Sequence, residues 1–134
     1  MPLTPDQQKS LIETALHVRD WAYTPYSHYN VGAALLTSSG KVYEGVNIEN
    51  AAYSITMCAE RVAVFKAVSE GEREFTALVV ATDNGGTSCG SCRQVLAEFG
   101  VATRVIFVDG EGRITLDTTV EKLLPQAFSS EDLK

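Results

Sequence analysis

The sequence predicts an α/β protein, built as a three-layer α/β/α sandwich around a mixed sheet. Two observations support this prediction. Segments whose apolar residues recur at helical spacing alternate along the chain with short β-rich runs. Two of these runs, residues 76–82 and 104–108, are almost continuously apolar, which is typical of strands covered on both faces. We therefore expect one sheet with helices packed against each side.

A helix is expected near the N-terminus, from Thr4 to about Tyr23. Thr4 can cap this helix, because proline occupies the next position and Gln7 is placed to complete a capping box. Apolar residues then recur at helical spacing, so one face of the helix can bury against a sheet. These residues are Leu11, Ile12, Ala15, Leu16, Val18 and Ala22.

An antiparallel hairpin and a second helix are expected next. Residues 31–37 and 42–49 are rich in β-forming residues, and Ser38-Ser39-Gly40 between them suits a hairpin turn. Residues 57–70 have a helical pattern whose apolar surface leaves only a narrow polar strip. A helix of this kind is expected to be covered on more than one side.

The rest of the chain continues the alternation of helices and strands. A turn over residues 83–86 leads into a predicted helix over about residues 89–99. The buried strand 104–108 follows it. Residues 118–124 are expected to form a short helix before Pro125, because a proline disfavours helical backbone in the residue that precedes it.

Length and composition indicate one globular domain over residues 1–134. Of these residues 45% are hydrophobic and 21% are charged, which allows a core without disulfide bonds. The formal net charge of -6 disfavours a nucleic-acid partner, because the surface would repel phosphates. No apolar run approaches the ~20 residues that span a bilayer, and the N-terminal residues lack the features of a signal peptide. We therefore expect a cytoplasmic protein without a nucleic-acid or membrane partner.

The three cysteines, Cys58, Cys89 and Cys92, predict a metal site. An odd number of cysteines in a reducing compartment argues against disulfides. Cys89 and Cys92 are three apart at a predicted helix start, so both sulfurs can turn toward one point. Cys58 opens the other helix, and helix N-termini lower the pKa of thiols. Three protein ligands leave one tetrahedral position for water, which is typical of catalytic zinc.

Charged residues stand beside these cysteines in the sequence. Glu60 is two residues beyond Cys58, so the turn that delivers a ligand also delivers a carboxylate to the open side of the metal. A carboxylate in that place suits general acid and base catalysis. Arg61 and Arg93 are adjacent to the ligands in the sequence, where their guanidinium groups could donate hydrogen bonds to sulfur.

The pattern resembles the small, homotetrameric cytidine deaminases. The zinc deaminase signature is His or Cys, Glu two residues later, and Pro-Cys-x-x-Cys further along. Here it reads Cys58-Ala59-Glu60 and Cys89-Gly90-Ser91-Cys92. The resemblance covers nearly the whole chain and includes Pro25-Tyr26-Ser27, Val31-Gly32-Ala33-Ala34-Leu35, Asn47-Ile48-Glu49-Asn50-Ala51, and Leu123-Leu124-Pro125 with Ala127-Phe128. It implies a cytidine deaminase-like fold with roughly five strands.

The resemblance also implies an activity and an assembly. The activity is hydrolysis of the amino group of free cytidine and deoxycytidine to uridine and deoxyuridine with release of ammonia. Zn²⁺, one per subunit, would activate the water that attacks C4 of cytosine, and Glu60 would shuttle the proton without binding the metal. The assembly would be a homotetramer in the cytoplasm, serving pyrimidine salvage, with active sites shared between subunits.

Several substrate contacts are implied in the same way. Asn47 and Glu49 match the family's ribose-binding pair, and they lie two apart on the predicted strand, so both side chains would leave one face. Tyr29 occupies a position that packs near the base. Phe128 matches an aromatic residue that reaches into a neighbouring subunit's site. The remaining implied contacts are Ala59 and Tyr53.

Three positions depart from the family's pattern, and one of them is Val46, which replaces a common family cysteine. Ser88 stands where the signature has proline before the first cysteine of the pair. Tyr29 stands where the family usually has phenylalanine, and its additional hydroxyl needs a hydrogen-bond partner if it is buried. We expect zinc binding to survive the change at Ser88.

Other interpretations of these residues stay open at the level of sequence. A redox protein would form a disulfide between Cys89 and Cys92 and bind no metal, which zinc analysis would reveal. A structural zinc site would need a fourth ligand, for which His17 and His28 are the available histidines. A nucleoside-binding module would bind its ligand without turnover. Within the deaminases, the alternative is an enzyme for another aminated nucleoside, such as blasticidin S.

Overall fold

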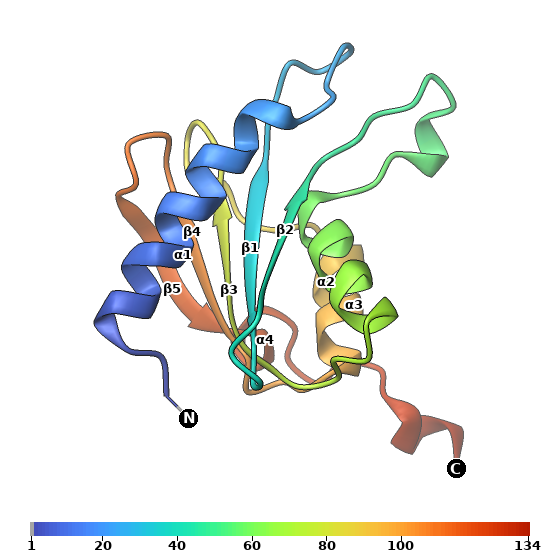
Figure 1. The fold of residues 1–134 in the computed structure, drawn as a ribbon. Coiled ribbons are helices and arrows are strands. Elements are labelled where there is room, and N and C mark those ends of the chain that lie inside the picture. Colours follow the sequence, from blue (N-terminus) through green and yellow to red (C-terminus); the bar gives the residue numbers. More distant parts are fainter. Residues whose placement is uncertain (1) are drawn as a thin grey trace.

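The computed structural model of the chain describes residues 2–134 and has the predicted three layers (Figure 1). Its helices are α1 (Pro5–Val18), α2 (Ala59–Ser69), α3 (Gly90–Glu98) and α4 (Val120–Leu123), with short 3-10 turns η1 (Arg19–Trp21), η2 (Tyr53–Ile55) and η3 (Ser130–Leu133). Its strands are β1 (Gly32–Thr37), β2 (Val42–Val46), β3 (Phe75–Ala81), β4 (Arg104–Val108) and β5 (Ile114–Thr119). Among residues 2–134 no helix combines the length and apolar character needed to cross a membrane.

The five strands form one mixed sheet in the order β2-β1-β3-β4-β5. The predicted hairpin is present, because β1 and β2 pair antiparallel. β3 pairs antiparallel with β1 and parallel with β4. The parallel pair requires a crossover connection, which α3 supplies.

The first helix begins as the sequence predicts. The Thr4 hydroxyl accepts a hydrogen bond from the Gln7 backbone at 3.1 Å, and the Gln7 side chain accepts one from the Thr4 backbone at 3.0 Å. The helix ends earlier than the predicted Tyr23, because α1 stops at Val18 and η1 continues it only to Trp21. Ala22 already has extended backbone angles, which end the helical turn.

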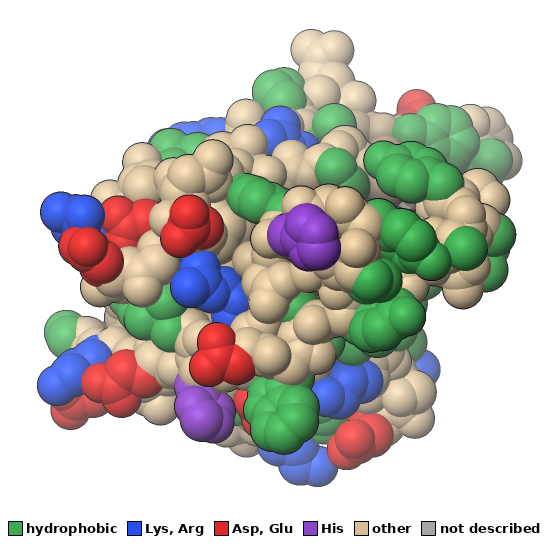
Figure 2. Space-filling model, turned by 90° about the horizontal axis from the view of Figure 1, so that it is seen from above, with side chains coloured by type: hydrophobic (Ala, Val, Ile, Leu, Met, Phe, Trp, Pro, Cys, Tyr) green, Lys and Arg blue, Asp and Glu red, His purple; other side chains and the backbone are tan. Residues whose placement is uncertain are grey.

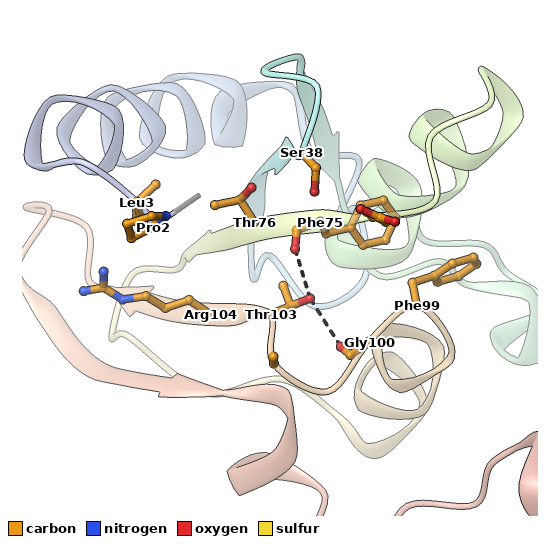
Figure 3. A pocket seen from close by; sticks show the side chains of 11 residues that line it. Pro2, Leu3, Ser38, Phe75, Thr76, Phe99, Gly100, Thr103 and Arg104 are labelled. Atoms are coloured by element: carbon orange, nitrogen blue, oxygen red, sulfur yellow. Dashed lines mark hydrogen bonds between the residues drawn. The ribbon is translucent and has the colours of Figure 1, made fainter.

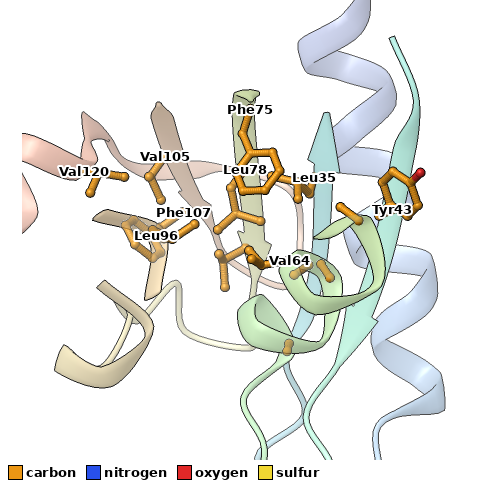
Figure 4. Packing of buried hydrophobic residues seen from close by; sticks show 14 residues of the cluster. Leu35, Tyr43, Val64, Phe75, Leu78, Leu96, Val105, Phe107 and Val120 are labelled. Atoms are coloured by element: carbon orange, nitrogen blue, oxygen red, sulfur yellow. The ribbon is translucent and has the colours of Figure 1, made fainter. Parts of the chain in front are cut away.

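Two hydrophobic cores lie on opposite faces of the sheet, as expected for strands covered on both sides. Along β1, for example, Leu35 faces α2 and α3, while Ala34 faces α1. The larger core is shown in Figure 4, and its buried residues are Ala33, Leu35, Tyr43, Ala59, Ala63, Val64, Ala67, Phe75, Leu78, Val80, Leu96, Val105, Phe107 and Val120. The smaller core consists of Leu11, Ala15, Ala34, Leu36, Ala77, Val79, Ala81, Ile106 and Val108.

Helix α2 lies close to β2 and also contacts β1, β3 and α3. A Cβ atom on Gly45 would lie 2.2 Å from the Ala59 carbonyl oxygen and 2.6 Å from the Ala63 nitrogen, so only glycine allows this approach. The helix packs against the sheet and against α3, in agreement with the prediction that it is covered on more than one side. Phe65 of this helix is 45% exposed, so part of the helix surface remains open.

One element in the second half of the chain was missed in the sequence, and another is shorter than predicted. β5 was not found from the residues alone. Its residues Ile114-Thr115-Leu116-Asp117 alternate between apolar and polar, and this short alternation was the available signal. Most residues of the strand are exposed at the edge of the sheet. The short helix expected over residues 118–124 is restricted to α4, which Thr119 caps by accepting from the Lys122 backbone at 3.4 Å.

The two ends of the sheet carry different features. Figure 3 shows a hollow of about 480 Å³ at one end, between the start of β3 and the turn that precedes β4. There the Thr103 hydroxyl lies 3.4 Å from the Phe75 carbonyl oxygen and 3.3 Å from that of Gly100. The residues that line this hollow include none of the predicted site residues. At the other end, the loops of residues 22–31 and 47–58 rise above the sheet (Figure 1).

Candidate metal centre and active site

The three cysteines meet at the helix N-termini, at the end of the sheet that carries the two long loops. Cys58 and Cys89 are the N-cap residues of α2 and α3, and Cys92 lies in the first turn of α3. The Cys89 sulfur lies 3.6 Å from that of Cys58 and 3.3 Å from that of Cys92. Tetrahedral zinc with bonds of ~2.3 Å would hold its sulfurs ~3.8 Å apart. The cluster therefore fits a zinc ion with little adjustment.

The geometry does not match the redox or structural-zinc interpretations. All three cysteines are free thiols, and their closest sulfur pair, at 3.3 Å, is far beyond a covalent bond of ~2.05 Å. In residues 2–134 the cluster contains three ligands, and neither histidine joins it. His17 is exposed on α1, and His28 lines a separate hollow. Three ligands leave a position for water, as in catalytic zinc sites.

Hydrogen bonds already favour a thiolate at one of the three positions. The pKa of the Cys58 thiol is lowered to about 5, because Cys92 and then Arg61 donate hydrogen bonds to its sulfur. The Arg61 donor is a terminal guanidinium nitrogen at 3.4 Å. The same Cys92 hydrogen bond, together with burial, raises the pKa of Cys92 itself. A bound divalent cation would replace the shared protons and favour thiolates at all three positions.

Arg93 does not contact the sulfurs, which corrects one prediction. It donates to the Ser88 hydroxyl at 3.3 Å, to the Thr87 hydroxyl at 3.4 Å and to the Leu123 carbonyl oxygen at 2.9 Å. Arg61 is three residues after Cys58 and shares its helix face. Arg93 is four residues after Cys89, but its guanidinium group is taken up by the three oxygen acceptors. Arg93 therefore ties the loop before Cys89 to the C-terminal segment.

Glu60 is a buried carboxyl group next to the cysteine cluster. Its side chain is 5% exposed and lies in the first turn of α2. Burial raises the pKa of Glu60 to about 7. A group with a pKa near neutrality can both accept and deliver a proton under physiological conditions, which suits general acid and base catalysis.

A cavity of about 210 Å³ lies between Glu60 and the loops. It is smaller than the ~300–1,000 Å³ typical of small-molecule sites, so it suits a small ligand. Of the predicted site residues, the ones that line it are Tyr29, Asn47, Cys58, Ala59, Glu60 and Cys89. Its other lining residues are Val31, Thr56, Met57, Val80, Thr82, Gly86, Thr87 and Ser88.

The sequence predicts that Asn47 lies on a strand, but the structure places it just beyond the end of β2. β2 ends at Val46, and the Asn47 side chain turns toward the loop that precedes β1. Its amide oxygen accepts from the Val31 backbone at 2.9 Å, and its amide nitrogen donates to the Tyr29 carbonyl oxygen at 2.8 Å. Asn47 therefore holds two cavity-lining residues in place.

Glu49 faces a different hollow from Asn47. Its carboxylate accepts hydrogen bonds at 3.1 Å from the backbone nitrogens of Tyr26 and Ser27, and a further one from the Ser27 hydroxyl. The Ser27 hydroxyl and these two backbone groups hold the pKa of Glu49 below its usual value. The hollow has a volume of about 490 Å³ and adjoins the metal cavity at Thr56.

Two predicted aromatic contacts lie outside the metal cavity of this chain. Tyr53 is 88% exposed and lines the hollow of Glu49. Phe128 is 59% exposed, and its carbonyl oxygen accepts from the Gln94 side chain at 2.9 Å. The backbone of the C-terminal segment is thus anchored to α3 while the aromatic ring of Phe128 faces outward.

Thr82 is a cavity residue that the sequence analysis missed. Its hydroxyl accepts from the Gly86 backbone at 2.9 Å, so it supports the loop that leads to Cys89. A polar residue at the carboxyl end of a buried strand, where ligands of α/β proteins bind, was the signal that could have identified it.

Comparisons with known proteins agree with this geometry. The model of the cytidine and deoxycytidylate deaminase zinc-binding region matches residues 5–108. The cytidine deaminase of Sporosarcina psychrophila is 51% identical over 127 residues, which is 93% of this chain and 93% of that protein. A crystal structure of cytidine deaminase from Burkholderia pseudomallei has a TM-score of 0.85 at 43% identity and covers 90% of this chain and 98% of that one. Blasticidin-S deaminase of Bacillus cereus is 29% identical over 133 residues, covering 92% of this chain and 93% of that protein.

The matched region contains both parts of the cysteine cluster and Glu60. A zinc-binding region over this span, together with a cysteine cluster that can hold a metal ion, identifies zinc as the cofactor. The predicted sandwich with its mixed five-stranded sheet is confirmed by the same structural likeness. The chain belongs to the cytidine and deoxycytidylate deaminase family.

Proposed function

We propose that this protein hydrolyses free cytidine and deoxycytidine to uridine and deoxyuridine with release of ammonia. The observation that carries the proposal is the buried Glu60 carboxyl beside three sulfurs that can hold one metal ion. The surrounding cavity is small and opens at the end of the sheet where both helix N-termini meet. This arrangement combines a metal site with a proton shuttle in a space suited to a small ligand.

Cys58, Cys89 and Cys92 would hold one zinc ion per chain. Zinc with three protein ligands keeps a position for water and lowers the pKa of that water, which supplies the nucleophile. Arg61 keeps its hydrogen bond to the Cys58 sulfur and offsets part of the negative charge of the thiolates. Arg93 and Ser88 hold the loop that delivers Cys89.

Glu60 would move the protons that the hydrolysis requires. Its carboxylate would take one proton from water and deliver it to N3 of the base. It would then take the second proton from the hydroxyl group added at C4 and deliver it to the departing amine. Oxygen replaces nitrogen at C4, so cytidine and water give uridine and ammonia. The raised pKa of about 7 supports this role, because neither protonation state is strongly favoured near neutral pH.

Asn47, Glu49 and Tyr29 would position the nucleoside. Asn47 uses one acceptor site and one donor on the protein, which leaves one of each for a sugar hydroxyl. The Glu49 carboxylate also keeps acceptor capacity in the adjoining hollow. Ala59 lines the metal cavity beside Glu60, so it is placed to contact the base.

The charge around the cavity supports a free nucleoside over a nucleotide. The cavity lining contains no lysine or arginine, and Glu49 stands in the adjoining hollow. The chain as a whole carries a formal net charge of -6. A phosphate group would therefore meet repulsion instead of a cationic partner.

The assay that tests this function measures ultraviolet absorbance and ammonia release with zinc-loaded protein. The substrates are cytidine, deoxycytidine, cytosine, CMP and blasticidin S. We expect turnover of the two nucleosides, with CMP slower than cytidine. Tight binding of cytidine without ammonia release would indicate a binding module. Turnover of blasticidin S alone would favour the second candidate, which the likeness to blasticidin-S deaminase suggests.

The proposal extends to a homotetramer with shared active sites. Figure 2 shows apolar side chains gathered on the end of the molecule that carries the two long loops. The exposed ones in these loops include Tyr23, Tyr26, Ile48, Tyr53 and Ile55. Exposed apolar patches mark contacts between proteins. Phe65 on α2 is a further exposed apolar residue.

Phe128→Ala is expected to lower kcat/KM for cytidine about tenfold or more, because the ring would leave a neighbouring subunit's site. Steady-state kinetics with sedimentation velocity measure the effect and the assembly. Leu133→Ala is the matched control, since Leu133 is another exposed apolar residue of the C-terminal segment. Parent kinetics from a monomeric Phe128→Ala protein would contradict site sharing.

We also place this enzyme in the cytoplasm, in pyrimidine salvage. Metal-binding thiols stay reduced in that compartment, whereas an oxidising one would favour disulfides. Salvage follows from the proposed substrates, because deamination converts a cytosine nucleoside into its uracil counterpart.

A further inference from the structure

Tyr29 separates two hollows at the active-site end of the molecule. One is the metal cavity of about 210 Å³. The other has a volume of about 380 Å³, and its remaining lining residues are polar or charged: Arg19, Asp20, His28, Asn30, Asp83 and Asn84. Tyr29 is the lining residue common to both. Its side chain is therefore the wall between them.

A hydrogen bond holds this wall in place. The Tyr29 hydroxyl donates to the Asn84 amide oxygen at 2.9 Å, across 55 residues of sequence. The Tyr29 backbone is held as well, because its nitrogen donates to the Ser27 hydroxyl at 3.0 Å and its carbonyl oxygen accepts from Asn47 at 2.8 Å. The loop before β1 is thus linked to the loop after β3.

The acceptor of this bond, the Asn84 amide oxygen, is also held in place. The Asn84 amide oxygen also accepts from the Gly86 backbone at 3.2 Å. A Cβ atom on Gly86 would lie only 2.8 Å from the Tyr29 hydroxyl oxygen, so the hydroxyl packs directly against the Gly86 backbone. Gly86 itself lines the metal cavity. The Tyr29 to Asn84 bond therefore closes the cavity along the loop that leads to Cys89.

We propose that Tyr29 and Asn84 form a partition that limits the size of the nucleoside the active site accepts. Tyr29 is the specificity-determining residue, and Asn84 is a positioning residue that acts through it. The identity of the substrate rests on the proposed function, whereas the partition rests on these contacts. With the partition intact, a substituent that points toward Tyr29 meets a fixed ring. Without it, the metal cavity joins the polar hollow and gains room for that substituent.

The test compares cytidine with cytidines that carry groups of increasing size at C5 of the base or at the 2′ oxygen of the sugar. Its readout is the ratio of kcat/KM for each larger substrate to kcat/KM for cytidine. For Tyr29→Ala we expect this ratio to rise about tenfold or more in at least one series, because the side chain that separates the two hollows is removed. Tyr29→Phe keeps the ring and loses the bond, so a rise of about three- to tenfold is expected, mainly through KM.

Asn84 offers a second, independent pair of variants. Asn84→Leu removes the acceptor and should raise the ratio as Tyr29→Phe does. Asn84→Asp keeps an acceptor oxygen for the Tyr29 hydroxyl and should restore the parent discrimination, which a merely structural role would not require. Tyr43→Phe is the matched control, because it removes a tyrosine hydroxyl bonded to Glu70 at 3.1 Å on the distant part of β2.

An unchanged ratio in zinc-containing Tyr29→Ala or Asn84→Leu protein would overturn the partition. If Tyr29→Ala does not fold, Tyr29→Phe and the Asn84 pair decide the question. If the parent protein does not deaminate cytidine, the proposed function fails separately. The same nucleosides are then compared by calorimetric binding to the zinc-loaded protein, and the variants must weaken the discrimination by size for the partition to stand.

Discussion

Glu60→Gln is expected to lower kcat for cytidine by about 10²- to 10⁴-fold and to leave one zinc ion bound per chain. Glutamine has nearly the same shape as glutamate, but its amide cannot take up and deliver a proton. Glu60 is the buried carboxyl of the metal cavity, and the three sulfurs of the cluster belong to other residues. Proton transfer and metal binding should therefore separate in this variant.

The measurement combines the absorbance assay with the zinc content of the purified protein. Glu13→Gln is the matched control, because Glu13 is an exposed residue of α1 on the opposite face of the sheet. That control should keep both turnover and metal. Deamination at the parent rate by Glu60→Gln protein would show that another group moves the proton. Loss of zinc together with activity would instead show that Glu60 supports the metal.

Cys89→Ala is expected to lose stoichiometric zinc and all measurable turnover. Two sulfurs would remain, and a zinc site built from three protein ligands loses much of its affinity when one is removed. Cys89 is the most informative of the three positions, because its side chain is exposed whereas Cys92 is buried in the core. The substitution therefore removes a ligand without opening a cavity, and folding should be retained.

Metal analysis, circular dichroism and the absorbance assay are measured on the same sample. Ser91→Ala is the matched control, because Ser91 is exposed between the same two cysteines and should keep zinc and activity. Treating the parent protein with a chelator should remove its activity, and adding zinc should restore it. A folded Cys89→Ala protein with full zinc content and the parent rate would contradict the proposed ligand set.

The sequence predicts the layers of this fold because the relevant signals are local. β3 and β4 are nearly continuous apolar runs, and the cap of α1 lies within four residues. The limits of the prediction have a local cause as well. β5 is an edge strand whose apolar residues Ile114 and Leu116 are exposed, so the short alternation in its sequence is a weak signal.

The candidate site also has parts that the sequence predicts and parts that it does not. The spacing of Cys89 and Cys92 on one helix turn, and of Glu60 beyond Cys58, could be interpreted without a structure. The contacts of Arg93 could not be predicted from the sequence, because its partners Ser88 and Leu123 lie on separate segments. Asn47 was likewise misplaced on a strand, because its side chain bonds to Val31, 16 residues away.

By itself, the sequence determined the class of fold, the metal-binding residue types and the carboxylate beside them, since each depends on residues that are near one another in the chain. Only the tertiary structure decided that the N-termini of α2 and α3 bring Cys58 within 3.6 Å of Cys89, across 31 residues. It also decided that Tyr29 bonds to Asn84 and so closes the cavity. Contacts of this kind depend on how the sheet orders its strands, because that order determines which loops become neighbours at its edge.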